Sequence, residues 1–403
     1  MGILIPLVLI TICCLVIWRA GDGFMTASAY VGRHLSEGVR GATINAIASS
    51  MPEVFTSFFF LFILQDASGF SGGIGTTAGS AIFNSMVIPA VSILAVVMMG
   101  MTNKIEVNQR VVRRDGIALI IAEFIFLVLI GGSKLDWYHG FVLMAIYLVY
   151  IGYMFWQMNR NQTASKEEQQ ASGERKAEEI QEEITADLES NKIKAFFTLD
   201  LESLFIGGSK INSVNAWSLL ITSTVAIATV CYFLVLACEW IGADTYHIAY
   251  LGTFNGLGIP VLFVALILAA AASSFPDTII SMKDARKGEY DDAISNALGS
   301  NIFDVCFALG FPLFIFTLIQ GPIYMPPDIV NMSTELRFLL WLLTIVAFVI
   351  FISSRYMGRG KAFLLLGIYV AFIIYVVGRG TGSEWAQNFG DTLVSIVRYF
   401  RIG

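Results

Sequence analysis

The sequence has little charge, little histidine and no cysteine arranged for chemistry. Charged residues make up 14% of the 403 residues and hydrophobic residues 56%, whereas soluble globular proteins have about 25% charged and about 45–50% apolar residues. The formal net charge of -6 gives no electrostatic support for nucleic-acid binding. The five cysteines lie inside apolar runs without zinc-site spacing, so we interpret them as packing residues.

Other signals are missing as well. No nucleophile–base constellation and no phosphate-binding loop are present, so the sequence predicts neither an enzyme nor a resident cofactor. The three histidines fall at predicted loops or span ends, which does not favour a proton relay. No Lys or Arg precedes the first apolar run, which is therefore not expected to be a cleaved signal peptide.

Long apolar stretches are what the sequence does have. Ten of them are close to the roughly 20 residues that span a bilayer, or long enough to tilt. They cover approximately residues 3–30, 40–64, 73–99, 116–132, 140–158, 216–238, 258–282, 292–319, 338–352 and 362–377. The sequence thus predicts an all-α membrane protein with ten transmembrane helices.

Basic residues set the expected orientation, because short cytoplasmic loops are rich in Lys and Arg. They flank alternate loops at Arg33, Arg40, Lys104, Arg110, Arg113, Arg114, Lys283, Arg286, Lys287, Arg355, Arg359 and Lys361. We therefore expect a five-helix unit at 1–158, a cytoplasmic charged loop at 159–215 and a second five-helix unit at 216–403. Both termini are expected outside a plasma (cell inner) membrane.

An acidic, helix-favouring segment lies between residues 166 and 189. One interpretation is a solvated helix or linker that joins the two halves. The other is a calcium-sensing regulatory loop, although no EF-hand pattern is present.

The two halves contain an internal repeat. Residues 48–53 (ASSMPE) match 272–277 (ASSFPD), and residues 79–84 (GSAIFN) match 299–304 (GSNIFD). Since each half has five predicted spans, an odd number, the second half enters the membrane in the opposite sense. The sequence therefore predicts two inverted five-helix repeats around a central site.

Two repeat-related acids, Glu53 and Asp277, lie inside apolar spans. A charge there costs at least ~2.5–3.5 kcal/mol on insertion scales, so such a residue normally faces a partner, a water-filled cavity or an ion. Arg19 is the one basic residue predicted well inside a span, and Asp22 is closer to it in sequence. Asp22 either faces a water-filled vestibule or pairs with Arg19 at a helix break.

A proline precedes each acid and predicts a kink, because proline cannot continue a helix interior but suits a first turn. Pro52 and Pro276 leave the carbonyl groups of Ala48 and Ala272 without their usual partners. Such carbonyls, hydroxyls and carboxylates are hard oxygen ligands that suit sodium and calcium. The hydroxyls belong to Ser49, Ser50, Ser273 and Ser274.

The second repeated segment adds polar pairs four residues apart, which share one helix face. These pairs are Ser80 with Asn84 and Ser300 with Asp304. The glycine before each serine permits close helix approach. The combined site holds three carboxylates, with a formal charge of up to -3, which a few sodium ions or one calcium ion would largely neutralise.

These motifs resemble those of the sodium/calcium exchanger family in the calcium:cation antiporter superfamily, over about half of the chain. The resemblance implies the sodium/calcium exchanger fold, with spans two, three, seven and eight as the ion core and spans one and six sliding past it. It implies Glu53 and Asp277 as central calcium ligands, with Na⁺ and Ca²⁺ as transported ions. It implies further ligands at Ser49, Ser50, Ser80, Asn84, Ser273, Ser274, Ser300 and Asp304 and at the carbonyl groups of Ala46 and Ala270.

The sequence departs from the family motifs in three ways. The motif glycine is replaced by Ala48 and Ala272, the threonine by serine, and the first-half asparagine by Ala81. Asp304 resembles the potassium-dependent subgroup, but some potassium-independent members share it, so potassium coupling stays open.

The sequence favours an antiporter that exchanges Na⁺ for Ca²⁺ by alternating access in the lipid bilayer, with no obligate protein partner evident. A calcium/proton exchanger of the same superfamily is the closest alternative, but its typical Asn-Ala-x-Glu motif is missing. A non-transporting calcium sensor does not explain carboxylates inside spans of both halves.

Overall fold

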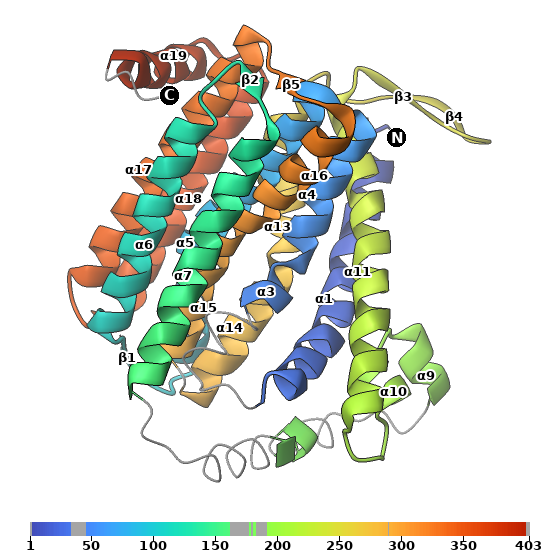
Figure 1. The fold of residues 1–403 in the computed structure, drawn as a ribbon, viewed down its shortest axis with the longest axis vertical. Coiled ribbons are helices and arrows are strands. Elements are labelled where there is room, and N and C mark those ends of the chain that lie inside the picture. Colours follow the sequence, from blue (N-terminus) through green and yellow to red (C-terminus); the bar gives the residue numbers. More distant parts are fainter. Residues whose placement is uncertain are drawn as a thin grey trace.

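The fold is a bundle of long helices, seen in a computed structural model that describes residues 2–33, 46–161, 177–178, 180–182, 192–288 and 290–399 (Figure 1). In the first half the helices are α1 (Leu4–Val31), α3 (Ala46–Ser49), α4 (Met51–Leu64), α5 (Asp66–Met98), α6 (Gln109–Leu129) and α7 (Trp137–Asn161). Two short helices follow, α9 (Lys192–Phe197) and α10 (Leu201–Phe205).

The second half repeats this order with more breaks. It contains α11 (Ser213–Gly242), α12 (Val261–Val264), α13 (Ala270–Ser273), α14 (Phe275–Lys287), α15 (Tyr290–Phe303), α16 (Gly310–Gln320), α17 (Pro327–Ile352), α18 (Arg359–Gly380) and α19 (Glu384–Tyr399). Two π-helical segments, η2 (Ala265–Ala269) and η3 (Asp304–Ala308), join α12 to α13 and α15 to α16.

Short antiparallel strand pairs tie the two halves together at both ends of α6 and α17. Strand β1 (Ile105–Glu106) pairs with β6 (Tyr356–Met357), and β2 (Lys134–Leu135) pairs with β5 (Ile323–Tyr324). The remaining pair, β3 (Thr245–Ile248) with β4 (Gly252–Asn255), is a hairpin after α11. Each of the first two pairs joins a strand next to α6 to one next to α17, as expected of repeated halves.

Within the described residues, seven helices are long and apolar enough to cross a membrane, and the count is eight if the bent pair formed by residues 261–273 and 275–287 is one span. Where its residues are described, each predicted span coincides with one helix or with a run of shorter helical segments. Two fall short of that test: α4 has only 14 residues, and α6 begins with Arg110, Arg113 and Arg114. The protein is thus an all-α, multi-span membrane protein, and the count of ten spans stays a prediction.

The predicted kinks lie where proline was expected to put them. Ser50 and Ser274 are non-helical caps, and Pro52 and Pro276 fall in the first turns of α4 and α14. In the second half the axis bends by 41° at this break. Each acid of the repeated motif therefore lies in the first turn of a half-helix, where the helix dipole favours negative charge.

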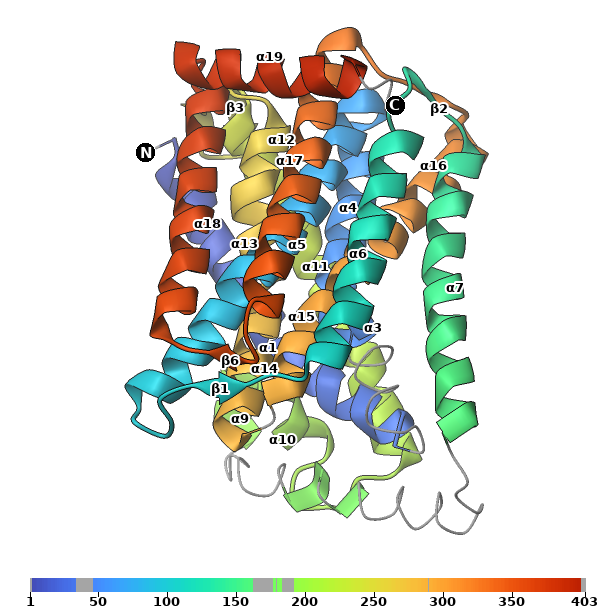
Figure 2. The same ribbon diagram turned by 90° about the vertical axis from the view of Figure 1, so that its left-hand side faces the viewer.

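The helix α5 lies at the centre of the bundle. It packs against α4, α14, α15, α17 and α18, whereas α1 packs mainly along α11 at the edge (Figure 1). The described ends of the chain lie at the same end of the bundle, opposite α9 and α10 (Figures 1 and 2).

Of the two alternatives for Asp22, a helix break with an Arg19 pair is wrong, because α1 runs without interruption to Val31. Asp22 forms an ion pair with Lys283 of α14 at 3.5 Å, and the Arg19 guanidinium lies 4.7 Å from the centre of the Trp18 ring. On the same helix Thr26 donates a hydrogen bond to Glu202 of α10, and burial raises the pKa of that carboxyl.

Arg19 is also not the one basic residue deep in a span. Arg337 lies inside α17 and is fully buried, because this helix begins at Pro327, well before the predicted start at 338. Its guanidinium donates to the Ser333 carbonyl at 3.1 Å, to the Leu127 carbonyl at 2.6 Å and to Thr334 Oγ1 at 3.0 Å. The charge is therefore satisfied by carbonyl and hydroxyl oxygens and does not neutralise the predicted site.

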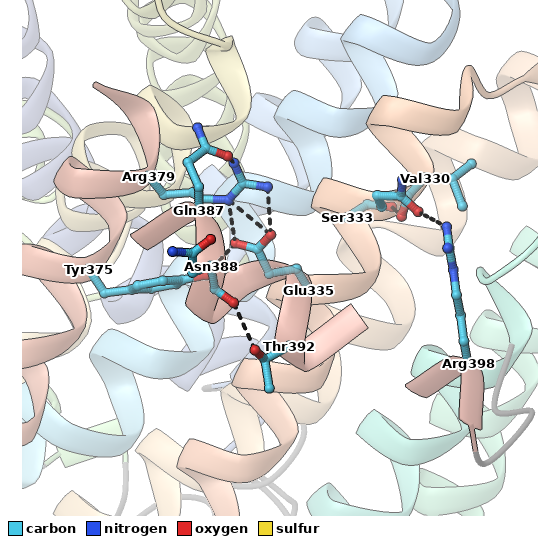
Figure 3. Close-up of polar contacts among 10 residues, drawn as sticks. Val330, Ser333, Glu335, Tyr375, Arg379, Gln387, Asn388, Thr392 and Arg398 are labelled. Carbon is cyan, nitrogen blue, oxygen red and sulfur yellow. Dashed lines mark hydrogen bonds and ion pairs between the residues drawn. The ribbon is translucent and has the colours of Figure 1, made fainter. Parts of the chain in front are cut away.

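A final helix, α19, was not predicted. It crosses the end of the bundle at a steep angle to the spans (Figure 2) and contacts α17 and α18. A polar network anchors it (Figure 3): Glu335 accepts a hydrogen bond from Tyr375 and pairs with Arg379 at 3.1 Å, and Arg379 also bonds Gln387 of α19. Gly390 lies directly against this network, since a methyl group there would be 2.6 Å from Glu335 Oε2.

Much of the predicted cytoplasmic loop lies outside the described residues, as do His34, Arg40 and residues 41–45. The two interpretations of the acidic segment at 166–189 therefore stay untested.

Candidate ion-binding site

The repeated motifs of the two halves meet in the middle of the bundle. Glu53 lies in the first turn of α4 and Asp277 in the first turn of α14. Ser80 and Asn84 project from the middle of α5, and Ser300 and Asp304 from the junction of α15 and η3. All of these side chains are fully buried. Because residues almost 200 positions apart converge there, the site exists only when both halves are packed together.

Ser80 connects the two halves. Its hydroxyl lies 2.9 Å from Glu53 Oε1 and 3.4 Å from Asp304 Oδ2, and it also hydrogen-bonds the Ser274 hydroxyl. Ser274 in turn donates to Glu53 Oε1 at 3.2 Å. A hydroxyl has one proton to donate, so Ser80 serves one carboxylate at a time.

The polar pairs of the second repeated segment leave some of their buried oxygens without hydrogen bonds. Asn84 Nδ2 lies 3.3 Å from Ser300 Oγ and 3.5 Å from Asp304 Oδ2. Three buried oxygens have no hydrogen-bond partner in the part of the chain that the structure describes, namely Glu53 Oε2, Asn84 Oδ1 and Asp304 Oδ1. Buried polar atoms are nearly always satisfied, so these carboxylate and amide oxygens are available to an ion that prefers oxygen.

The electrostatics favour a cation at this position. The Asp304 carboxylate is repelled by Glu53 and by Asp277, and Glu53 is also repelled by Asp277; the hydrogen-bond partners of Glu53 and Asp304 are hydroxyl and amide groups. Neither of them forms a salt bridge with a basic side chain of the described ranges. Buried carboxylates without a cationic partner are costly, and a bound cation removes that cost.

The acids alone do not form a compact ligand cage. Among the described residues, no three His, Cys, Asp or Glu side chains are grouped so that they alone hold one metal ion. A cation bound between these acids would therefore also need hydroxyl, amide or backbone oxygens, which is the mixed oxygen coordination typical of calcium sites.

The remaining predicted residues lie around this centre. Ser50 and Ser273 are fully buried and Ser49 is 2% exposed, all beside the helix breaks. Ser273 Oγ donates to the Ala270 carbonyl at 3.2 Å, so one predicted backbone ligand already accepts a hydrogen bond. Ala46 begins α3 at the matching place in the first half. The structure does not test whether Ser49 or the Ala46 carbonyl reaches an ion.

Asn301 is a buried polar residue to which we assigned no role from the sequence. Its Nδ2 atom donates to the Ala81 carbonyl at 2.9 Å and to Ser85 Oγ at 2.8 Å, which pins α15 to α5 beside the site. The sequence contained a signal for this role, because Asn301 lies between the candidate ligands Ser300 and Asp304 in the repeated motif and therefore close to the site.

Close packing of α5 on the second half depends on Gly79. A methyl group at this position would lie 2.2 Å from the Leu266 carbonyl oxygen and 2.7 Å from Ala270 Cβ. The expectation that the glycine before Ser80 permits close helix approach is therefore confirmed.

We expect Gly79→Ala to destabilise the protein by about 1–3 kcal/mol, the usual cost of overpacking, and to weaken transport. The backbone of η2 must move away, which separates Ser80 from Ser274. Gly152→Ala in α7 is the matched control, because nothing lies within 4 Å of the added methyl. Thermal unfolding in detergent measures the difference, and equal melting temperatures for the two variants would contradict the packing argument.

Comparison with known proteins agrees with this architecture. A family model described as "Sodium/calcium exchanger protein" matches residues 5–156 and 215–378, which is most of the chain. The chain belongs to the sodium/calcium exchanger family. The matched ranges contain both repeated motifs and omit the charged loop and α19.

Individual relatives of this exchanger-family protein share only part of its sequence. The human "Sodium/potassium/calcium exchanger 5" is 29% identical over 402 residues, which cover 85% of this chain and 77% of the relative. The Drosophila melanogaster "Sodium/potassium/calcium exchanger Nckx30C" is 34% identical over 138 residues, which cover 33% of this chain and 15% of the relative.

Solved structures support the fold of this exchanger-family protein. A structure of the H⁺/Ca²⁺ exchanger CAX matches with a TM-score of 0.58 and 12% identity, covering 97% of this chain and 92% of that one. A structure of the sodium-calcium exchanger NCX_Mj matches with a TM-score of 0.53 and 20% identity, covering 92% and 98%. The predicted exchanger fold is thus confirmed.

Proposed function

We propose that this protein is a secondary antiporter that exchanges Na⁺ for Ca²⁺ by alternating access. The observation that carries the proposal is the meeting of Glu53, Asp277 and Asp304 in a fully buried site made from both halves. Membership of the sodium/calcium exchanger family supports the choice of ions. The protein needs no catalytic group or resident cofactor for this activity, because the ion gradient supplies the energy.

The proposed binding cycle follows from the site. In the cation-loaded state, Glu53 and Asp277 face the ion from opposite half-helices, and their negative charge is neutralised. Additional oxygens come from Ser49, Ser50, Ser80, Asn84, Ser273, Ser274, Ser300 and Asp304 and from the carbonyl groups of Ala46 and Ala270. Because an empty site leaves carboxylates buried without a cation, the protein crosses between its two open states more readily when loaded. This coupling of occupancy to movement produces exchange.

The proposal includes location and sidedness. The protein lies in the plasma (cell inner) membrane with the loop at 159–215 in the cytoplasm and both termini outside. The basic residues that flank alternate loops support this orientation. The helices α9 and α10 lie at the end of the bundle opposite the termini (Figure 2). The lipid bilayer is then its environment, and we propose no obligate protein partner.

The decisive experiment uses sealed vesicles that contain the purified protein. Vesicles loaded with Na⁺ are diluted into Na⁺-free buffer with labelled calcium, and uptake is followed with and without a pH gradient. We expect uptake driven by the Na⁺ gradient and little uptake driven by the pH gradient alone. Uptake that requires only the pH gradient would instead identify a calcium/proton exchanger, and a lack of any uptake would favour a sensor.

Potassium co-transport is a second candidate. It is favoured by Asp304, which adds a third carboxylate to the site, and by the names of the relatives. Adding K⁺ to the calcium side of the same vesicles tests it. If K⁺ is transported with Ca²⁺, uptake depends on the K⁺ concentration and labelled rubidium enters with the calcium.

A further inference from the structure

Tyr147 lies behind the proposed site, on a helix outside the four that form the ion core. It belongs to α7, which packs against η3, the segment that begins with Asp304. The Tyr147 ring stands edge-on against Phe303, with centroids 5.0 Å apart, and lies 6.0 Å from the Phe307 ring. The side chain is only 2% exposed. Its position is therefore set by two aromatic residues that flank Asp304 in the chain.

The Tyr147 hydroxyl is buried and has no hydrogen-bond partner among the residues that the structure describes. Burying a hydroxyl without a partner costs about 1–3 kcal/mol in proteins. Tyrosine hydroxyls therefore usually find a partner when buried. A phenylalanine would fill the same space without this cost, so packing alone does not account for the hydroxyl.

Asp304 Oδ1 is the acceptor that we consider for this hydroxyl. This carboxylate oxygen is buried and accepts no hydrogen bond of ordinary geometry in the described chain, whereas Oδ2 of the same residue lies within 3.5 Å of Ser80 and Asn84. The Ser50 hydroxyl also acts on the Asp304 carboxylate and is a second donor near it. The Asp304 carboxylate is close enough to act electrostatically on the Tyr147 phenol, but the two side chains do not form a direct hydrogen bond in this structure. An unsatisfied donor on α7 and an unsatisfied acceptor at the start of η3 thus lie on two segments that pack together, and π-helical turns are often found at functional sites.

We propose that Tyr147 is a positioning residue of the ion site, whose hydroxyl donates a hydrogen bond to Asp304 Oδ1 through one water molecule. This inference rests on the proposed function, because it assigns Asp304 to the site. The hydrogen bond holds the carboxylate with Oδ2 directed toward Ser80 and Asn84, where the cation binds. It also stabilises the negative charge of a carboxylate that is buried in the membrane.

The same helix offers a matched control. Tyr150 lies one helical turn further along α7, and its hydroxyl donates to Asp115 Oδ1 at 3.3 Å. Asp115 in turn pairs with Arg114 at 2.6 Å. Tyr150 therefore serves a separate ion pair, so removing its hydroxyl changes α7 in a similar way without touching Asp304.

The test compares Tyr147→Phe with Tyr150→Phe in the full-length protein. Cation binding is measured by calorimetry in detergent with NaCl, CaCl₂ and KCl separately, and KM and kcat are measured for calcium flux in vesicles. We expect Tyr147→Phe to weaken the affinity for at least one of these cations about tenfold, as loss of a hydrogen bond to a charged group implies. The corresponding KM should rise while the melting temperature and kcat change little. Tyr150→Phe should leave affinity unchanged.

A double-mutant cycle sharpens the test. In an Asp304→Asn background, Tyr147→Phe should have almost no further effect on affinity, because the acceptor charge is gone. Unchanged affinity in Tyr147→Phe, an equal loss in Tyr150→Phe, or an undiminished loss in the Asp304→Asn background would each overturn the inference. Calorimetry keeps the test independent of flux: failure of Na⁺-driven uptake in the unmodified protein counts against the proposed exchange, and not against the role of Tyr147.

Discussion

Glu53→Gln is expected to abolish sodium-driven calcium uptake while leaving the protein folded and at least as heat-stable as before. Glutamine keeps the Oε1 acceptor that receives hydrogen bonds from Ser80 and Ser274, so local packing is preserved. It removes the charge that binds the cation. Since loss of an indirect, outer-shell partner already costs about 10–100-fold in metal affinity, loss of a direct charged ligand should cost more than about 100-fold.

The melting temperature is expected to stay the same or to rise while calcium uptake is lost. This combination distinguishes the loss of an ion ligand from misfolding. A buried charge inside a span costs at least about 2.5–3.5 kcal/mol, which the neutral amide does not require. Asp277→Asn should behave in the same way, because it occupies the equivalent position in the second half. Uptake and melting temperature measured on the same preparation separate a lost ligand from a misfolded protein.

The control for this prediction is Glu123→Gln. Glu123 is also fully buried in a predicted span, but it accepts a hydrogen bond from Thr344 of α17 at 2.9 Å, and neither residue belongs to a repeated motif. We expect this variant to retain uptake. Full activity in Glu53→Gln, or an equal loss in Glu123→Gln, would contradict the assignment of the site.

The sequence was most informative where a local rule acts. Proline cannot continue a helix interior, so Pro52 and Pro276 marked the breaks at Ser50 and Ser274 correctly. Helical spacing alone placed Ser80 and Asn84 on one face of α5. The internal repeat then indicated that both motifs belong to one site, and the convergence of the two halves on Ser80 agrees with this.

Features that depend on distant partners were not predictable. Arg337 is buried because the Leu127 carbonyl, more than 200 positions away, accepts its hydrogen bond. Asp22 of α1 pairs with Lys283 of the other half and not with Arg19 on its own helix. In the sequence, Tyr147 is one more aromatic residue in an apolar run, and only the folded structure shows that its helix packs against η3. In each case the deciding contact is made by tertiary packing.

The helix α19 escaped prediction for a different reason. Its apolar residues recur on one face and alternate with polar ones, so it contains no long apolar run. Ala386, Gly390, Leu393, Val394 and Val397 form the buried face, while Trp385 and Phe389 stay exposed. Such a pattern is typical of an amphipathic helix at the end of a bundle or at a membrane surface, and a search for spans passes over it.

Arg379→Met is expected to produce the largest loss of stability outside the ion site. Arg379 is the ion-pair partner of Glu335, whose side chain is completely buried, and it also bonds Gln387 of α19 (Figure 3). Removing one partner of a buried pair leaves the other charge uncompensated and costs about 3–5 kcal/mol. We expect a lower melting temperature in detergent and faster proteolytic cleavage near α19.

A second substitution tests the cause. Glu335→Gln in the Arg379→Met background removes the stranded charge and keeps an acceptor for Tyr375, so it should restore much of the lost stability. Lys134→Met is the matched control, since Lys134 pairs with Asp136 at 3.2 Å in an exposed position and such pairs contribute about 0–1 kcal/mol. A double variant as unstable as Arg379→Met alone would show that α19 depends on the arginine side chain itself. Rescue would show instead that α19 is held by the need to keep Glu335 paired.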